Sequence, residues 1–146
     1  MSQAEQNEKV AAQPSRARIF KWVAAIFFVV LAVVSVMNLP RGYSDDLSPI
    51  GKGKVAVVLI RDKNAVQTFE LMDAMNEIRD EYSDRVEFLL TDFNTPQGRA
   101  FMAAHGAPRV TVVVLDAKGK MVNILSTPLS GEHLKHEISM ALQGAS

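Results

Sequence analysis

The feature that most constrains this chain is an uncharged apolar run near its amino terminus. Trp22 to Leu39 are eighteen consecutive positions without a formally charged side chain. As a helix, which rises about 1.5 Å per residue, the run reaches about 27 Å, close to the roughly 30 Å of bilayer hydrocarbon. We therefore expect one membrane-spanning helix over 19–39. The residues expected to anchor it in lipid are Trp22, Phe27, Phe28, Leu31 and Val34.

The flanking charges indicate how the helix is oriented. Four basic and two acidic side chains precede the run, whereas Arg41 and then Asp45 and Asp46 follow it. Because short cytoplasmic segments carry an excess of Lys and Arg, we expect the amino terminus in the cytoplasm and the rest of the chain across the membrane. This predicts a single-pass protein of a bacterial inner membrane with a periplasmic carboxy-terminal domain.

The alternative is a cleaved secretory signal, which also combines a basic start with an apolar middle. Three features favour an uncleaved anchor: a long amino-terminal arm, a long apolar core and the absence of Ala-x-Ala after it. Cleavage after Ser35 would instead release a periplasmic domain.

The remaining composition allows one small domain of about 100 residues. From Pro40 onward, twelve Lys and Arg stand against fourteen Asp and Glu, so charge gives no reason to expect nucleic acid as a partner. The chain contains no cysteine, which excludes disulfides, thiolate nucleophiles and iron–sulfur ligation. We expect no cofactor. The expected organisation is a disordered tail (1–18), the anchor (19–39), a linker rich in Pro, Gly, Ser and Asp (40–53) and a domain (54–146).

Strand and helix patterns alternate within this domain. Leu71, Met75 and Ile78 recur at helical spacing, whereas VAVVLI is the continuous apolar run of a strand covered on both faces. We expect the two helix-containing links to join parallel strands and a hairpin to add an antiparallel one. The result is an α/β fold with a mixed four-stranded sheet and helices on both faces. The expected elements are strands 55–60, 85–93, 110–115 and 121–125, and helices 64–82, 96–105 and 130–142.

Four segments in this order, KVAVVLI, NEIRDEYSDRVEFLLTDFN, TVVVLDAKGKMV and LSGEHLKHEISMAL, resemble the thioredoxin family. The resemblance covers about Lys54 to Leu142. It implies a Cys-x-x-Cys pair where the first strand meets the first helix, but here Ala65 and Thr68 occupy those positions. It also implies a cis-proline before the third strand, where Val110 stands. A cis bond before a non-proline residue costs about 2.5–4 kcal/mol, so we expect Val110 to be trans.

Other polar residues suggest weaker candidates. His133 and His136, with Glu132 and Glu137, are spaced to share one helix face, but nothing in the sequence supplies further metal ligands, so we expect no metal. His105 at a helix end is explained by the helix dipole.

The resemblance points to a partner surface, because in thioredoxins the corresponding edge meets other polypeptides. We expect a non-enzymatic, redox-inactive accessory subunit that binds the bilayer and another membrane or periplasmic protein. An enzyme with changed chemistry, acting through His105, Asp92 or a metal, is the alternative, and a structural subunit is a third. The candidate partner surface comprises Arg61, Asp62, Lys63, Ala65, Thr68, Arg109, Val110 and Thr111.

Overall fold

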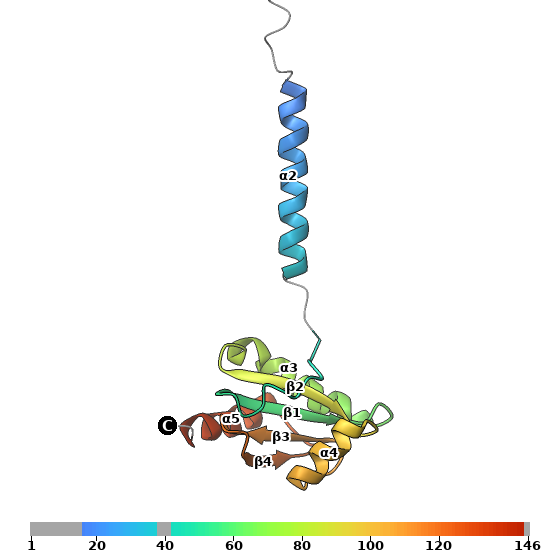
Figure 1. The fold of residues 1–146 in the computed structure, drawn as a ribbon, viewed down its shortest axis with the longest axis vertical. Coiled ribbons are helices and arrows are strands. Elements are labelled where there is room, and N and C mark those ends of the chain that lie inside the picture. The colour runs from blue at the N-terminus through green and yellow to red at the C-terminus, as the bar shows by residue number, and fades with distance from the viewer. Residues whose placement is uncertain (1–15, 38–41, 145–146) are drawn as a thin grey trace, which may run out of the picture. The chain divides into compact units, whose positions relative to one another are not determined.

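The computed structural model describes residues 16–37 and 42–144, which belong to two separate units (Figure 1). The first is helix α2 (Arg16–Met37), whose 22 residues span about 33 Å. An 18-residue stretch of it has a mean hydropathy of 2.6, and in the described part of the chain it alone has the length and composition of a membrane span. A signal sequence near the amino terminus shares these properties. The five expected anchor residues are all exposed on it. Residues 38–39 of the expected anchor and 1–15 of the expected tail lie outside the described residues.

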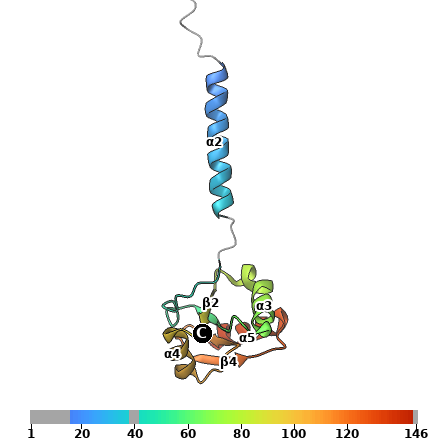
Figure 2. The ribbon, with the colours of Figure 1, turned by 90° about the vertical axis from the view of Figure 1, so that its right-hand side faces the viewer.

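The second unit is an α/β domain around one four-stranded sheet, with strand order β2-β1-β3-β4. Its helices cover both faces: α3 and α5 lie on one side and α4 on the other (Figure 2). This confirms the expected fold class. The elements are β1 (Val55–Arg61), α3 (Val66–Tyr82), β2 (Val86–Asp92), α4 (Pro96–His105), β3 (Thr111–Leu115), β4 (Met121–Leu125) and α5 (Gly131–Gly144).

The two faces of the sheet are buried in separate apolar clusters. Since successive strand residues point to opposite faces, Val57 and Leu59 of β1 pack with α3 and α5, whereas Val58 and Ile60 pack with Phe101 of α4. All four β1 side chains have 0% exposure. The central strand is therefore apolar at every one of these positions, which explains the continuous run VAVVLI.

Both ends of α4 and the start of α5 follow local capping chemistry. The Thr95 hydroxyl accepts a hydrogen bond from Gly98 N at 3.0 Å, Pro96 occupies the first turn, and Gly106 ends α4 in a left-handed conformation. Ser130 Oγ accepts from His133 N at 3.2 Å at the start of α5. The structure confirms the predicted bounds of α4, because Thr95, Pro96 and Gly106 mark its two ends.

The direction of β3 corrects our expectation that both helix-containing links join parallel strands. β1 and β2 are parallel, but β3 is antiparallel to β1, with Ile60 opposite Thr111. Helix α4 has only ten residues, about 15 Å, and Gly106, with φ of 62°, turns the chain back. The link therefore leaves and re-enters the sheet at the same edge, so β3 runs in the opposite direction.

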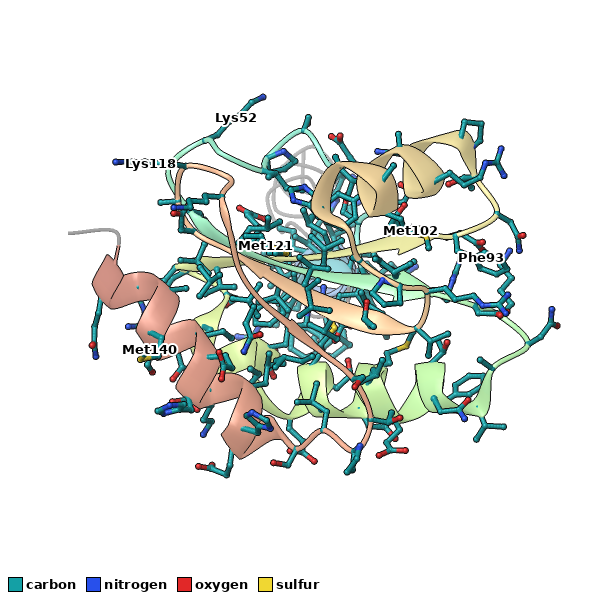
Figure 3. The ribbon with its side chains drawn as sticks, turned by 90° about the horizontal axis from the view of Figure 1, so that it is seen from below. Lys52, Phe93, Met102, Lys118, Met121 and Met140 are labelled. Carbon is teal, nitrogen blue, oxygen red and sulfur yellow. The ribbon has the colours of Figure 1, made fainter. Side chains whose placement is uncertain are left out.

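The segment expected to be a linker packs on the domain from Gly42 onward. Ser44 O accepts a hydrogen bond from Leu90 N at 2.9 Å, which adds a short parallel bridge outside β2. Tyr43 packs against the α3/α5 cluster, and Leu47 and Ile50 pack against the α4 cluster. At the far end of the segment, Lys52 lies beside Lys118 of the β3–β4 turn (Figure 3).

Burial of Tyr43 predicts a loss of stability at alkaline pH. Burial raises the pKa of Tyr43 to about 12 from 10.0; Arg79 opposes this rise and Asp73 and Asp80 reinforce it. Between these values the folded chain keeps a proton that the unfolded chain releases, so the free energy of unfolding falls as pH rises through this window. Below it, Tyr43 contributes no slope.

Because Tyr43 is only half-buried, we expect the loss to be about 1 kcal/mol from about pH 9 to about pH 12. Urea unfolding of the full chain in lipid nanodiscs at both pH values measures it. Tyr43→Phe serves as the reference, since it keeps the ring and removes the ionisable hydroxyl. An identical pH dependence in this variant would contradict the prediction.

Candidate interaction site

The candidate residues meet at the edge of the sheet where β1 and β2 end and β3 begins. The register pairs Arg61 with Asp92 across β1 and β2, and Ile60 with Thr111 across β1 and β3. Val110 N also donates a hydrogen bond to Ile60 O at 3.0 Å. The antiparallel direction of β3 is essential here, because a parallel β3 would begin at the opposite edge.

The start of α3 holds Ala65 and Thr68, the two positions that the sequence resemblance matched to the thiols of thioredoxins, and neither side chain is a thiol. Ala65 is the N-cap residue, and Thr68 N donates to Ala65 O at 3.1 Å. Thr68 is 2% exposed, and its hydroxyl donates to Asp62 O at 2.8 Å and accepts from Asp62 N at 3.2 Å. The Thr68 hydroxyl therefore stabilises the β1–α3 loop from inside the domain and is not accessible to a partner.

The loop before β3 contains a strained residue. Val110 has φ of 59°, a left-handed conformation that costs a β-branched residue about 1–3 kcal/mol. Within the described residues the one cis peptide bond is Thr127–Pro128, so the bond before Val110 is trans, as expected. The adjacent Thr111 is 4% exposed and donates its hydroxyl to Pro108 O at 2.7 Å.

Charged side chains surround the same edge. Asp92 Oδ2 lies 3.6 Å from Arg61 Nη2 and 3.7 Å from Lys63 Nζ, and its other oxygen accepts from Asn94 N at 3.0 Å. The guanidinium carbon of Arg109 stands 5.4 Å from the centre of the Phe93 ring. Phe93 lies at the end of the sheet opposite Lys118 (Figure 3).

Two exposed apolar residues of this edge were missed by our sequence reasoning. Val66 and Phe69, in the first turn of α3, are 79% and 61% exposed. They lie three residues apart on the face opposite the buried stripe of Leu71, Met75 and Ile78. Their spacing was a signal that we did not use, because the apolar stripe alone already explained the helix.

The other candidates take structural positions. The ring of His105 packs against Phe101 at 4.5 Å between centres. His133 Nε2 lies 3.7 Å from Glu137, which also accepts from Asn123 Nδ2 at 3.0 Å. Across residues 16–37 and 42–144, no three His, Asp or Glu side chains converge as metal ligands would.

The sheet order, the mixed strand directions and the distribution of helices define a thioredoxin-like fold. Solved structures agree with this assignment. The chain is similar to an uncharacterized thioredoxin-like protein from Clostridium perfringens, with a TM-score of 0.61 and 11% identity over 68% of this chain and 79% of that one.

Two further structures are similar to the chain. A malarial protein gives a TM-score of 0.50 at 19% identity, over 61% of this chain and 98% of that one. Fasciola hepatica thioredoxin gives 0.49 at 21% identity, over 62% and 84%. No protein-family model and no curated protein matches the sequence. At 11% and 19% identity, the similarity to the Clostridium perfringens and malarial proteins shows the fold alone.

Proposed function

We propose that this chain is a membrane-anchored, redox-inactive thioredoxin-like protein that binds another membrane or periplasmic protein as an accessory or assembly subunit. The observation that carries the proposal is the exposed pair Val66 and Phe69, placed where the fold would otherwise present its thiols. Because the chain has no cysteine, this edge has no thiol–disulfide exchange to perform. It retains an apolar contact surface.

The surroundings of the pair resemble a protein–protein interface in composition. Apolar and aromatic side chains form the centre of such interfaces, and charged groups lie at the rim. Here Lys63 precedes Val66 by three residues, and Arg109 lies just before β3, which begins where β1 ends. We define the α3 patch as Lys63, Val66, Phe69 and Arg109.

Helix α2 contributes to the same function as a membrane anchor. The basic residues before its apolar run, among them Arg16, Arg18 and Lys21 in the first turns of α2, favour a cytoplasmic amino terminus and so a periplasmic domain at a bacterial inner membrane. Confinement to the membrane raises the effective concentration of a partner held there, so a modest contact surface suffices.

Replacing the aromatic residue of the α3 patch should release the partner. We expect Phe69→Ser to lower the amount of co-purified partner about tenfold, because exposed aromatic residues are typical interface hot spots. The measurement is quantitative mass spectrometry of proteins cross-linked to the full chain in its native membrane and purified with it. Met140→Ser is the matched control, since Met140 is 54% exposed on α5, away from this edge (Figure 3).

Two results would oppose the proposal. Purification of the wild-type chain without a stoichiometric partner would contradict the accessory role. Equal losses of co-purified partner in the Phe69 and Met140 variants would show that the α3 patch is not the contact surface.

Alkaline carbonate extraction tests the anchor separately, because an uncleaved α2 keeps the chain in the membrane pellet, whereas a cleaved signal releases it.

A further inference from the structure

A small cavity, which shares Lys63 with the α3 patch, lies between the ends of β1 and β2 and the first turn of α4. Its volume is about 250 Å³, and it is lined in part by Arg61, Lys63, Asp92, Gln97 and, from the 42–53 segment, Asp45. This is below the usual range of about 300–1,000 Å³ for pockets that hold a drug-sized ligand. The cavity therefore fits a single chemical group better than a whole cofactor.

Two cations in this cavity have hydrogen-bonding capacity that the protein does not use. Arg61 and Lys63 both face Oδ2 of Asp92, at 3.6 and 3.7 Å, and within the described residues neither side chain makes a hydrogen bond. Arg61 Nε is buried without a partner. A guanidinium offers five donors in a fixed planar arrangement, so one long ion pair leaves most of them without a protein partner.

The charged residues around the cavity indicate which ligand would use these donors. The two cations stand against Asp92 and Asp45, so the lining carries no net charge, and Asp45 is exposed with no ion pair of its own in the described chain. A singly charged, planar oxyanion matches this arrangement better than a doubly charged phosphate, because Asp45 repels added negative charge and because guanidinium binds carboxylates through paired N–H groups.

We propose that this cavity binds a carboxylate group, held by Arg61 and Lys63. The carboxylate belongs either to a small free acid or to an acidic side chain of another protein, since both present the same chemistry. The site goes beyond the proposed function and does not depend on it, because it is tested by direct binding without a partner.

The test is an NMR titration of the full chain in nanodiscs, which detects weak binding at individual amides. The probes are propionate for a free acid, a peptide with blocked ends and one glutamate for a protein side chain, inorganic phosphate, and sodium chloride at equal ionic strength. We expect propionate or the peptide to shift the amide signals of Thr95 and Gln97, and phosphate to bind more weakly. A response to propionate alone assigns a free acid; a response to the peptide alone assigns a protein side chain.

Three variants test the assignment of residues. Lys63→Gln should weaken binding about three- to fivefold without harming the fold, since this side chain is 69% exposed. Asp45→Asn should strengthen binding about twofold by removing the repulsion. Lys118→Gln, at the opposite end of the sheet, should leave it unchanged. Shifts no larger than those from sodium chloride, unaltered binding in the Lys63 variant, or weaker binding in the Asp45 variant would each overturn the proposal.

Discussion

Replacing Gly98 by alanine should destabilise the domain by about 3 kcal/mol, because the added methyl group has no space. A Cβ at this position would lie 1.9 Å from the carbonyl oxygen of Asp92 and 2.7 Å from its carbonyl carbon. These are backbone atoms, so no side-chain rotation relieves the clash. Alanine in place of glycine inside a helix gains only about 0.5–1 kcal/mol, so the clash outweighs the gain in helix propensity.

Urea unfolding of the full chain in nanodiscs measures this effect. Gly42→Ala is the control, since a Cβ added there would meet no atom within 4 Å and no loss is expected. The Gly98 variant should also weaken carboxylate binding, because α4 must move away from Asp92. An unfolding midpoint equal to that of the unmodified chain would contradict the close approach of α4 to β2.

Introducing cysteines at positions 65 and 68 should create a disulfide where the chain has none. Ala65 and Thr68 form one turn, with Thr68 N donating to Ala65 O at 3.1 Å. Such a turn brings its first and last Cα atoms within about 7 Å, which overlaps the roughly 4.4–6.8 Å range of disulfides. The helix amino terminus lowers the pKa of a thiol placed there and favours its oxidation.

We expect the double variant to lose all free thiols after mild oxidation, as measured with a thiol-reactive dye under denaturing conditions. Each single variant keeps its thiol and is the control. The reduced double variant should be about 1–2 kcal/mol less stable, because Thr68 loses both hydrogen bonds to Asp62. Thiols that stay free in the oxidised double variant would show that these two positions do not correspond to the family's pair.

Local signals determined how much of the fold was predictable. The bounds of α4 follow from Thr95, Pro96 and Gly106, whose effects extend over one helical turn, and β4 follows from the turn before it. Our prediction of a parallel β3 was wrong because no local sequence pattern indicates at which edge a link re-enters the sheet. That information lies in the contact between Val110 and Ile60, fifty positions apart.

The candidate site was predictable only in part for a similar reason. Arg61, Lys63 and Asp92 follow two neighbouring strands, so their proximity follows from the sheet. Val66 and Phe69 were missed because the buried stripe of Leu71, Met75 and Ile78 was enough to predict the helix. Nothing then required an explanation for the other apolar residues on it. The inward orientation of the Thr68 hydroxyl depends on loop geometry that the sequence does not express.

The bridge from Ser44 to β2 determines where a soluble fragment of this protein has to begin. An open strand edge offers unpaired backbone groups to other chains and promotes aggregation. A fragment starting at Lys54, the first residue of the apparent domain, would uncover the edge of β2 and the apolar surfaces beneath Tyr43, Leu47 and Ile50. Fragments for crystallisation or spectroscopy should therefore start at Gly42.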